Sequence, residues 1–185
     1  YTHLATSIPV VFGGRPMSED GTANFVVDVD NIESASLATR YLIDHGRRRI
    51  ATIAGRQDMA AGLDRFEGWR RTLEAAGLAA DLHEVGDFTP SGGAAAMTRL
   101  IDRGVPFDAV FIASDQMASG ALGVLREHGL SVPEDVAIVG FDNDYFSTTS
   151  MPPLTTVAQP SVELGSRMAE ILVRLISGGT AERLT

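Results

Sequence analysis

Polar side chains follow four apolar runs of this sequence, at the points where those runs end. The residues after the runs are Gly55-Arg56-Gln57-Asp58, Gly86-Asp87-Phe88, Ser114-Asp115-Gln116 and Asp142-Asn143-Asp144. Carboxylates, hydroxyls and amides can each bond to the hydroxyl groups of a ligand, and an aromatic ring can pack on the apolar face of a sugar. Arg65, in the segment after Gly55, can supply a guanidinium. This chemistry suits a polyol better than a lipid or a metal ion.

Most of these residues also have a purely structural interpretation. Ser114 or Asp115 can cap the helix that follows, Phe88 can act as a hydrophobic staple, and Arg65 can be a solvated helix residue. Asp142 is harder to explain in this way. It directly follows an apolar run, and a buried carboxylate there needs polar partners.

The apolar runs alternate with amphipathic segments. Short runs rich in Val and Ile predict buried strands, and apolar residues at helical spacing predict helices. The expected strands are Ile8–Phe12, Phe25–Val27, Ile50–Ala54, Val110–Ala113 and Val136–Phe141, with weaker ones around His83–Val85 and Thr155–Val157; the expected helices are Ile32–His45, Gly62–Ala76, Gly92–Arg103, Met117–His128 and Val162–Ile176.

This alternation predicts an α/β fold with doubly wound, mostly parallel sheets. In open sheets of this kind, ligands bind beyond the carboxyl ends of the strands. The polar residues that follow the apolar runs are therefore expected to meet in one site. Trp69 shares an apolar helix face with Phe66 and Leu73, so we expect it in the core instead.

Composition narrows the function classes. The net charge of −9 disfavours binding of nucleic acid by this segment, and the one basic cluster, Arg47-Arg48-Arg49, is interpreted as a solvated turn. The absence of cysteine excludes disulfides and thiolate metal sites, and it fits a cytoplasmic protein. No apolar run approaches the roughly 20 residues that a membrane span needs.

An enzymatic function has little support in the sequence. Phosphate-binding, dinucleotide-binding, serine-hydrolase and zinc-protease motifs are all missing, and the four histidines lack metal-ligand spacing. The alternative that stays open is an acid/base pair of Asp115 and Asp142, as in glycoside hydrolysis. We expect no catalytic residues, no metal and no cofactor.

Several segments, taken together and in order, resemble the LacI/GalR family of transcription regulators over nearly the whole chain. The segments are Leu37-Ala38-Thr39, Arg47-Arg48-Arg49-Ile50-Ala51, Arg65-Phe66-Glu67-Gly68-Trp69, Ser114-Asp115-Gln116-Met117-Ala118-Ser119-Gly120-Ala121, Val132-Pro133-Glu134-Asp135-Val136-Ala137-Ile138-Val139-Gly140-Phe141-Asp142 and Met151-Pro152-Pro153-Leu154-Thr155-Thr156-Val157-Ala158-Gln159-Pro160.

The resemblance implies a two-lobed, periplasmic-binding-protein-like architecture, truncated at the N-terminus, with an effector held between the lobes. Residues 1–46 would be the remainder of the N-terminal lobe, residues 47–146 the C-terminal lobe, and residues 147–185 the return to the N-terminal lobe with a crossover. The effector-binding residues carried over from the family are Arg65, Phe88, Ser114, Asp142 and Gln159; Asp115 joins them from its position after the strand.

The resemblance also implies partners. The chain would be the effector-binding and dimerisation core of a cytoplasmic regulator, with a small-molecule effector such as a sugar. It would reach operator DNA only through an absent N-terminal head. A homodimer would form through the Met117–His128 helix and the Phe146–Met151 loop. The alternative is a periplasmic sugar-binding protein of a transport system, which shares the architecture but is usually a monomer.

Overall fold

The computed structural model describes residues 8–17 and 25–179, and the chain divides into two compact units. Unit 2 comprises residues 30–159 and carries all the candidate site residues. Unit 1 comprises residues 1–29 and 160–185. Each unit is described by itself.

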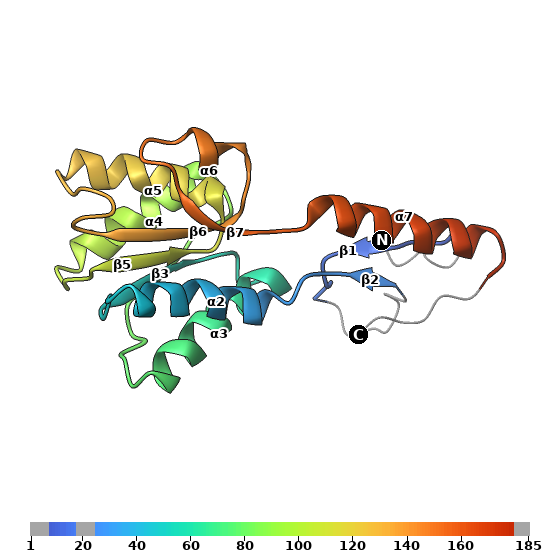
Figure 1. Ribbon diagram of the computed structural model, residues 1–185, viewed down its shortest axis with the longest axis horizontal. Coiled ribbons are helices and arrows are strands. Elements are labelled where there is room, and N and C mark those ends of the chain that lie inside the picture. The colour runs from blue at the N-terminus through green and yellow to red at the C-terminus, as the bar shows by residue number, and fades with distance from the viewer. Residues whose placement is uncertain (1–7, 18–24, 180–185) are drawn as a thin grey trace. The chain divides into compact units, whose positions relative to one another are not determined.

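Unit 2 is built on a five-stranded sheet in which every neighbouring pair is parallel (Figure 1). The sheet has the order β4-β3-β5-β6-β7. Its strands are β3 (Ile50–Ala54), β4 (His83–Val85), β5 (Ala109–Ile112), β6 (Ala137–Asp142) and β7 (Thr155–Ala158). Val and Ile fill the central strands because both of their faces are buried, which confirms the predicted α/β class.

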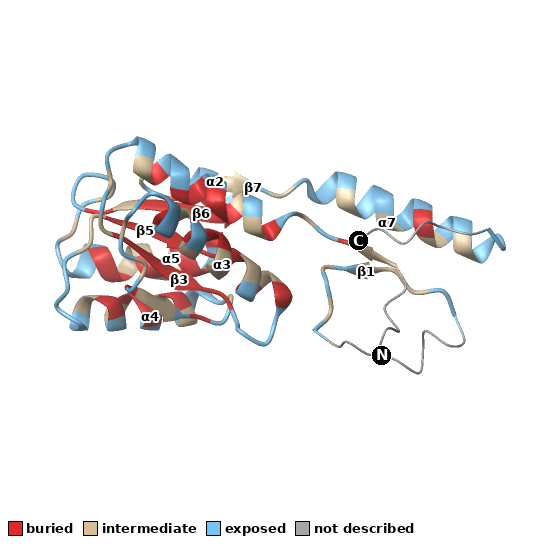
Figure 2. Ribbon diagram, turned by 90° about the horizontal axis from the view of Figure 1, so that it is seen from below, coloured by how far each residue is buried: buried red, intermediate tan, exposed pale blue. Residues whose placement is uncertain are grey.

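Helices cover both faces of this sheet, so the buried residues form an inner layer (Figure 2). On one face, α2 (Asn31–Asp44) and α3 (Ala60–Ala75) pack on Ile50, Phe111 and Phe141, with Trp69 of α3 0% exposed. On the other face, α4 (Pro90–Asp102) and α5 (Asp115–Glu127) pack on alternate residues of the same strands. The predicted core position of Trp69 is confirmed.

Glycines allow α4 and α5 to approach closely. A Cβ on Gly120 would lie 1.8 Å from the carbonyl oxygen of Pro90, and a Cβ on Gly93 would lie 2.1 Å from that of Met117. Both obstacles are backbone atoms, so neither contact can be relieved by rotating a side chain. The layer on this side of the sheet therefore depends on glycine at both positions.

The strand order places a topological switch point between β3 and β5. The chain passes from β3 outward to β4, and then returns to the other side of β3 to form β5, β6 and β7. At such a point the connections after neighbouring strands leave in opposite directions, which opens a crevice at the carboxyl edge of the sheet. Strands β3, β4, β5 and β6 all end at this edge, so the segments that follow them begin there.

The described part of unit 1 is smaller. Strands β1 (Phe12–Gly13) and β2 (Val26–Val27) pair in parallel, and α7 (Ser161–Ile176) contacts both of them. The strand expected at Ile8–Phe12 is wrong for residues 8–11, because the pairing with β2 begins at Phe12. Within the described residues, no helix is long and apolar enough to cross a membrane.

The boundaries between compact units differ from those expected at residues 46/47 and 146/147. Helix α2 packs against α3 and the sheet, and β7 pairs with β6, so both elements belong to unit 2. The short helix α6 (Tyr145–Thr149) was not expected, because five residues give too short a window for a helical period. The unit boundaries and the helix α6 both depend on long-range packing, which the sequence of a single segment does not indicate.

Candidate functional site

The carboxyl edge of the sheet concentrates unusual backbone geometry. Among the described residues, the only non-glycine residues with positive φ are Phe88 (67°), Asp142 (115°) and Asn143 (57°). Phe88 lies three residues beyond β4, Asp142 is the last residue of β6, and Asn143 follows it. Such conformations cost on the order of 1–3 kcal/mol each and persist where the surroundings over-determine them, typically at ligand sites.

Arg65 of α3 lies at the centre of this edge and is 5% exposed. Its Nε donates to the Asn31 side-chain oxygen at 2.9 Å, and its Nη1 donates to the carbonyl oxygen of Ala113 at 2.6 Å. The guanidinium carbon lies 3.6 Å from the ring centroid of Phe141. Arg65 is thus not a solvated helix residue: hydrogen bonds and a cation–π contact hold its charge at one place.

Asp142 faces this guanidinium. Its Oδ1 lies 3.4 Å from Nη1 of Arg65 and accepts a hydrogen bond from the side-chain amide of Gln159. Burial raises the pKa of the Asp142 carboxyl above its usual value, although Arg65 and Gln159 oppose the shift. The half-buried carboxylate therefore has the polar partners that its position in the sequence demanded.

Two of these partners lie next to the points where the chain passes between the units. Asn31 is the second residue of unit 2, and Gln159 is its last. Asn31 is 2% exposed, and its side chain bonds to Arg65, whereas the Gln159 side chain bonds to Asp142. The Arg65–Asp142 pair thus contacts a residue at each end of unit 2.

Phe88 and Ser114 occupy the same edge with different roles. The half-buried Phe88 ring lies over Gly55, where a Cβ would come within 2.1 Å of it, and its centroid lies 5.9 Å from the guanidinium of Arg65. Ser114 is 3% exposed and its hydroxyl accepts a hydrogen bond from the amide of Met117. The structural interpretation of Ser114 as a helix N-cap is correct.

Asp115 lies behind the edge. Its side chain is fully enclosed: Oδ1 accepts from the Thr156 hydroxyl at 2.7 Å and Oδ2 accepts from the amide of Asp144 at 3.0 Å. Burial raises the pKa of the Asp115 carboxyl. Among the described residues, no group of three or more His, Cys, Asp or Glu side chains is arranged to hold a metal ion.

The structure therefore brings together Arg65, Phe88, Asp142 and Gln159, and places Ser114 and Asp115 beneath them. Sequence reasoning missed Asn31, Thr156 and Phe141 as partners of these residues. Phe141 had a signal, since it ends the apolar run before Asp142. Asn31 and Thr156 lie far along the chain from the side chains that they contact, and only the packed sheet brings them there.

Comparisons with known proteins agree with this architecture. The family described as "Periplasmic binding protein-like domain" matches residues 39–184. The HTH-type transcriptional regulator CelR of Thermobifida fusca is 49% identical over 177 residues, which cover 95% of this chain and 52% of that protein. The HTH-type transcriptional repressor CytR of Escherichia coli K12 is 40% identical, with 85% of this chain and 48% of that protein covered.

A solved structure described as a CelR–cellobiose complex superposes with a TM-score of 0.90 at 49% identity, covering 95% of this chain and 54% of that one. The fold and the polar edge define a periplasmic-binding-protein-like domain. The chain belongs to the LacI/GalR family, within its effector-binding core, and spans about half the length of the curated relatives it matches.

Proposed function

We propose that this chain is the effector-binding and dimerisation core of a cytoplasmic, DNA-binding transcription regulator, and that its effector is a sugar of the cellobiose type. The observation that carries the proposal is the pair of buried Arg65 and half-buried Asp142 at the carboxyl edge, beside the Phe88 ring. A guanidinium and a carboxylate can each engage two neighbouring hydroxyls, and the ring offers an apolar face. The choice of cellobiose rests on the CelR relative.

In this proposal the chain binds its effector without changing it. The enzymatic alternative needed Asp115 and Asp142 as a pair facing one substrate, but the Asp115 carboxylate is enclosed and engaged on both oxygens. Operator DNA is contacted by a separate head segment, because a net charge of −9 gives these 185 residues little attraction for phosphates. Both curated relatives described above are regulators, which favours this function over a transport binder.

Calorimetry of the full chain with cellobiose, glucose and a nucleoside tests the effector. We expect saturable binding of cellobiose, weaker binding of glucose and none of the nucleoside. Tighter binding of the nucleoside would refute the sugar assignment. Chromatography of the sugar recovered after long incubation should show it intact, and hydrolysis would refute the non-enzymatic part of the proposal.

Acidification should weaken this binding. Protonation removes the negative charge of Asp142 and makes one of its two accepting oxygens an O–H donor, which weakens its contacts with Arg65 and with sugar hydroxyls. Burial raises the pKa of this carboxyl group. Affinity should therefore be constant at neutral pH and fall on acidification at a higher pH than for an exposed aspartate. Calorimetric titrations between about pH 4 and about pH 7 measure this pH dependence, because the range begins near the ordinary pKa of an aspartate and extends well above it. An affinity that stays flat to the lower limit would contradict the role of Asp142.

The raised pKa of Asp142 also makes the free energy of unfolding depend on pH. The folded chain binds the Asp142 proton more tightly than the unfolded chain does, so this contribution is complete below the unfolded pKa and is lost as pH rises through the folded one. Glu67 acts oppositely, since hydrogen bonding to Arg70 lowers its pKa to about 2. Unfolding measured at each pH therefore separates loss of binding from loss of fold.

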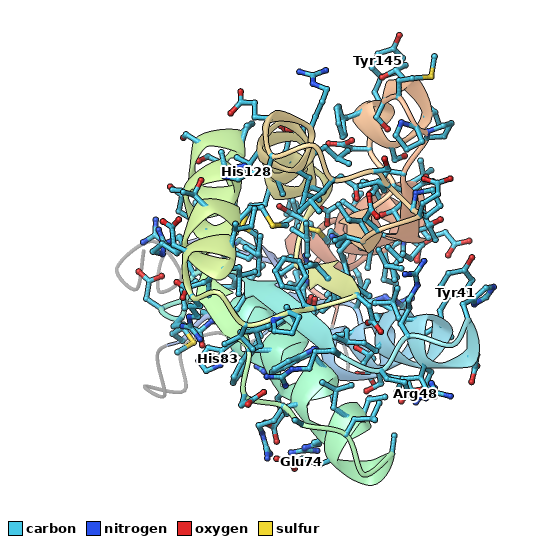
Figure 3. All side chains as sticks on the ribbon, turned by 90° about the vertical axis from the view of Figure 1, so that its left-hand side faces the viewer. Tyr41, Arg48, Glu74, His83, His128 and Tyr145 are labelled. Carbon is cyan, nitrogen blue, oxygen red and sulfur yellow. The ribbon has the colours of Figure 1, made fainter. Side chains whose placement is uncertain are left out.

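A surface beside α5 supports the dimer expected from Met117–His128 and Phe146–Met151. A cavity of about 570 Å³ lies between the second half of α5, the loop after it and the segment around α6. Met151 at its border is 94% exposed, and Tyr145, 83% exposed, projects outward from α6 (Figure 3). Apolar side chains this exposed beside a cavity are typical of an interface between copies.

Replacing Met151 with aspartate should convert the dimer to a monomer. The side chain is almost wholly exposed within one copy, so the change leaves the fold intact but places a charge in the proposed interface. Sedimentation velocity should show half the wild-type mass. Leu37→Asp is the matched control, because Leu37 is exposed on α2 and does not line the cavity. A monomeric wild-type chain would instead favour the transport-binder alternative.

A further inference from the structure

Two residues in succession at the end of β6 have strained backbone conformations, and the first of them, the last residue of the strand, is the proposed ligand-binding Asp142. Asp142 has φ 115° and Asn143 has φ 57°, conformations that side chains with a Cβ rarely adopt. The β6–β7 pairing at Asp142–Ala158 is not sufficient to set this turn, because it ends where the turn begins. Contacts other than the backbone pairing of β6 with β7 must therefore hold the next two residues.

Asp115 and Thr156 supply that support. The amide of Asn143 donates to the Thr156 hydroxyl at 3.3 Å, and the amide of Asp144 donates to Asp115 Oδ2 at 3.0 Å. The Thr156 hydroxyl in turn donates to Asp115 Oδ1 at 2.7 Å, which links the two acceptors. Both amides that follow Asp142 are therefore held by one connected pair of side chains from α5 and β7.

The backbone of β6 is shaped to admit this pair. A Cβ on Gly140 would lie 2.2 Å from Asp115 Oδ1 and 2.9 Å from Leu154 Cδ2, so the carboxylate lies directly against the strand two residues before Asp142. Asp115 is 0% exposed, and each of its oxygens already accepts a hydrogen bond. In this geometry it has no surface to offer a ligand.

We infer that Asp115 and Thr156 are positioning residues: together they hold the turn in which Asp142 and Asn143 have positive φ, so that the Asp142 carboxylate faces Arg65 and the effector. Asp115 thus serves binding through Asp142 and not by direct contact with the sugar. This inference rests on the proposed function for its effect on affinity. The effect on the turn stands on the hydrogen bonds alone.

A matched pair of substitutions at Thr156 tests it. Thr156→Val keeps the branched shape but removes the hydroxyl, so the Asn143 amide loses its acceptor and Asp115 loses a donor. Thr156→Ser keeps the hydroxyl. Hydrogen exchange read at the Asn143 and Asp144 amides, together with calorimetry using cellobiose, measures the turn and the binding separately.

We expect Thr156→Val to speed exchange at both amides about tenfold and to weaken cellobiose binding about tenfold, the effect of one lost hydrogen bond in each case. Thr156→Ser should restore both. Unchanged exchange in Thr156→Val, or a failure of Thr156→Ser to restore it, would overturn the inference. If wild type does not bind cellobiose, the proposed effector fails, and the exchange result still decides the role of the pair.

Asp115→Asn serves as the second variant if Thr156→Val does not fold. An asparagine of the same shape can accept from only one of the two donors, since its amide nitrogen faces the other. The same tenfold changes in exchange and affinity are expected. Wild-type exchange at Asn143 and Asp144 in a folded Asp115→Asn chain would overturn the inference as firmly as the Thr156 result.

Discussion

Replacing Asp142 with alanine should lower the affinity for cellobiose by about 100-fold or more, the effect of losing hydrogen bonds to a charged group in a partly enclosed site. The carboxylate faces Arg65 and accepts a hydrogen bond from Gln159, so its removal also takes a negative charge away from the guanidinium. Calorimetry of the Asp142→Ala chain should show no measurable heat of binding at cellobiose concentrations that saturate wild type.

The fold should survive this change. Asp142 is partly exposed, whereas Arg65 keeps its hydrogen bonds to Asn31 and Ala113 and its contact with Phe141. Thermal unfolding of the variant checks that the chain is intact. Asp102→Ala, at the exposed end of α4, is the control and should bind as wild type does. Unchanged affinity in a folded Asp142→Ala chain would refute the assignment of the site.

The largest loss of stability is expected at a glycine. Gly120→Ala places a methyl group 1.8 Å from the carbonyl oxygen of Pro90, so α4 and α5 must move apart. Because this packing is backbone against backbone, we expect the free energy of unfolding to fall by about 3 kcal/mol, the upper range for overpacking a close-packed core. Urea unfolding followed by circular dichroism measures the change.

Gly123→Ala is the matched control for this prediction. Gly123 lies in the same helix, and a Cβ there would meet no heavy atom within 4 Å. Alanine should stabilise the helix by about 0.5–1 kcal/mol, because it restricts the unfolded chain more than glycine does. Gly123 also lines the cavity of the proposed interface, so both variants are compared at one low protein concentration. Equal effects at the two positions would contradict the close approach of α4 and α5.

Local patterns predicted the elements of unit 2 well. The Val- and Ile-rich runs of β3, β5 and β6 are buried on both faces, so these strands consist mostly of apolar residues and are easy to recognise. The glycines that end the helices could also be predicted from the local sequence. Gly46, Gly77, Gly104 and Gly129 all adopt positive φ at helix ends, where a residue with a Cβ would be strained.

The membership of the two units could not be predicted in the same way. Helix α2 and strand β7 lie at opposite ends of unit 2 in the sequence, and their own residues fit either unit. Their place is decided by the partners they meet, α3 for the helix and β6 for the strand. The same reason explains why a strand was expected over the whole of Ile8–Phe12. An apolar run predicts burial but does not indicate which strand it pairs with.

The candidate site was predictable at its charged residues and not beneath them. Asp142 stood out because a carboxylate directly after an apolar run demands partners, whereas Arg65 was assigned through the family resemblance. The structure supplies polar partners for both side chains. Asp115 shows the limit of that reasoning. Its position after β5 suggested a ligand contact, but its side chain turns inward to Thr156 and to the Asp144 amide. The direction of a side chain at a strand end depends on the neighbouring strands.

The enclosure of Trp69 gives unit 2 its own optical reporter. It is the single tryptophan among the 185 residues, it lies in unit 2, and its indole is 0% exposed beside Phe66 and His83. Tryptophan fluorescence therefore originates in the α2–α3 layer alone, and its shift to longer wavelength on hydration follows the opening of that layer. The emission therefore reports on the packing of unit 2 around Trp69 without any label.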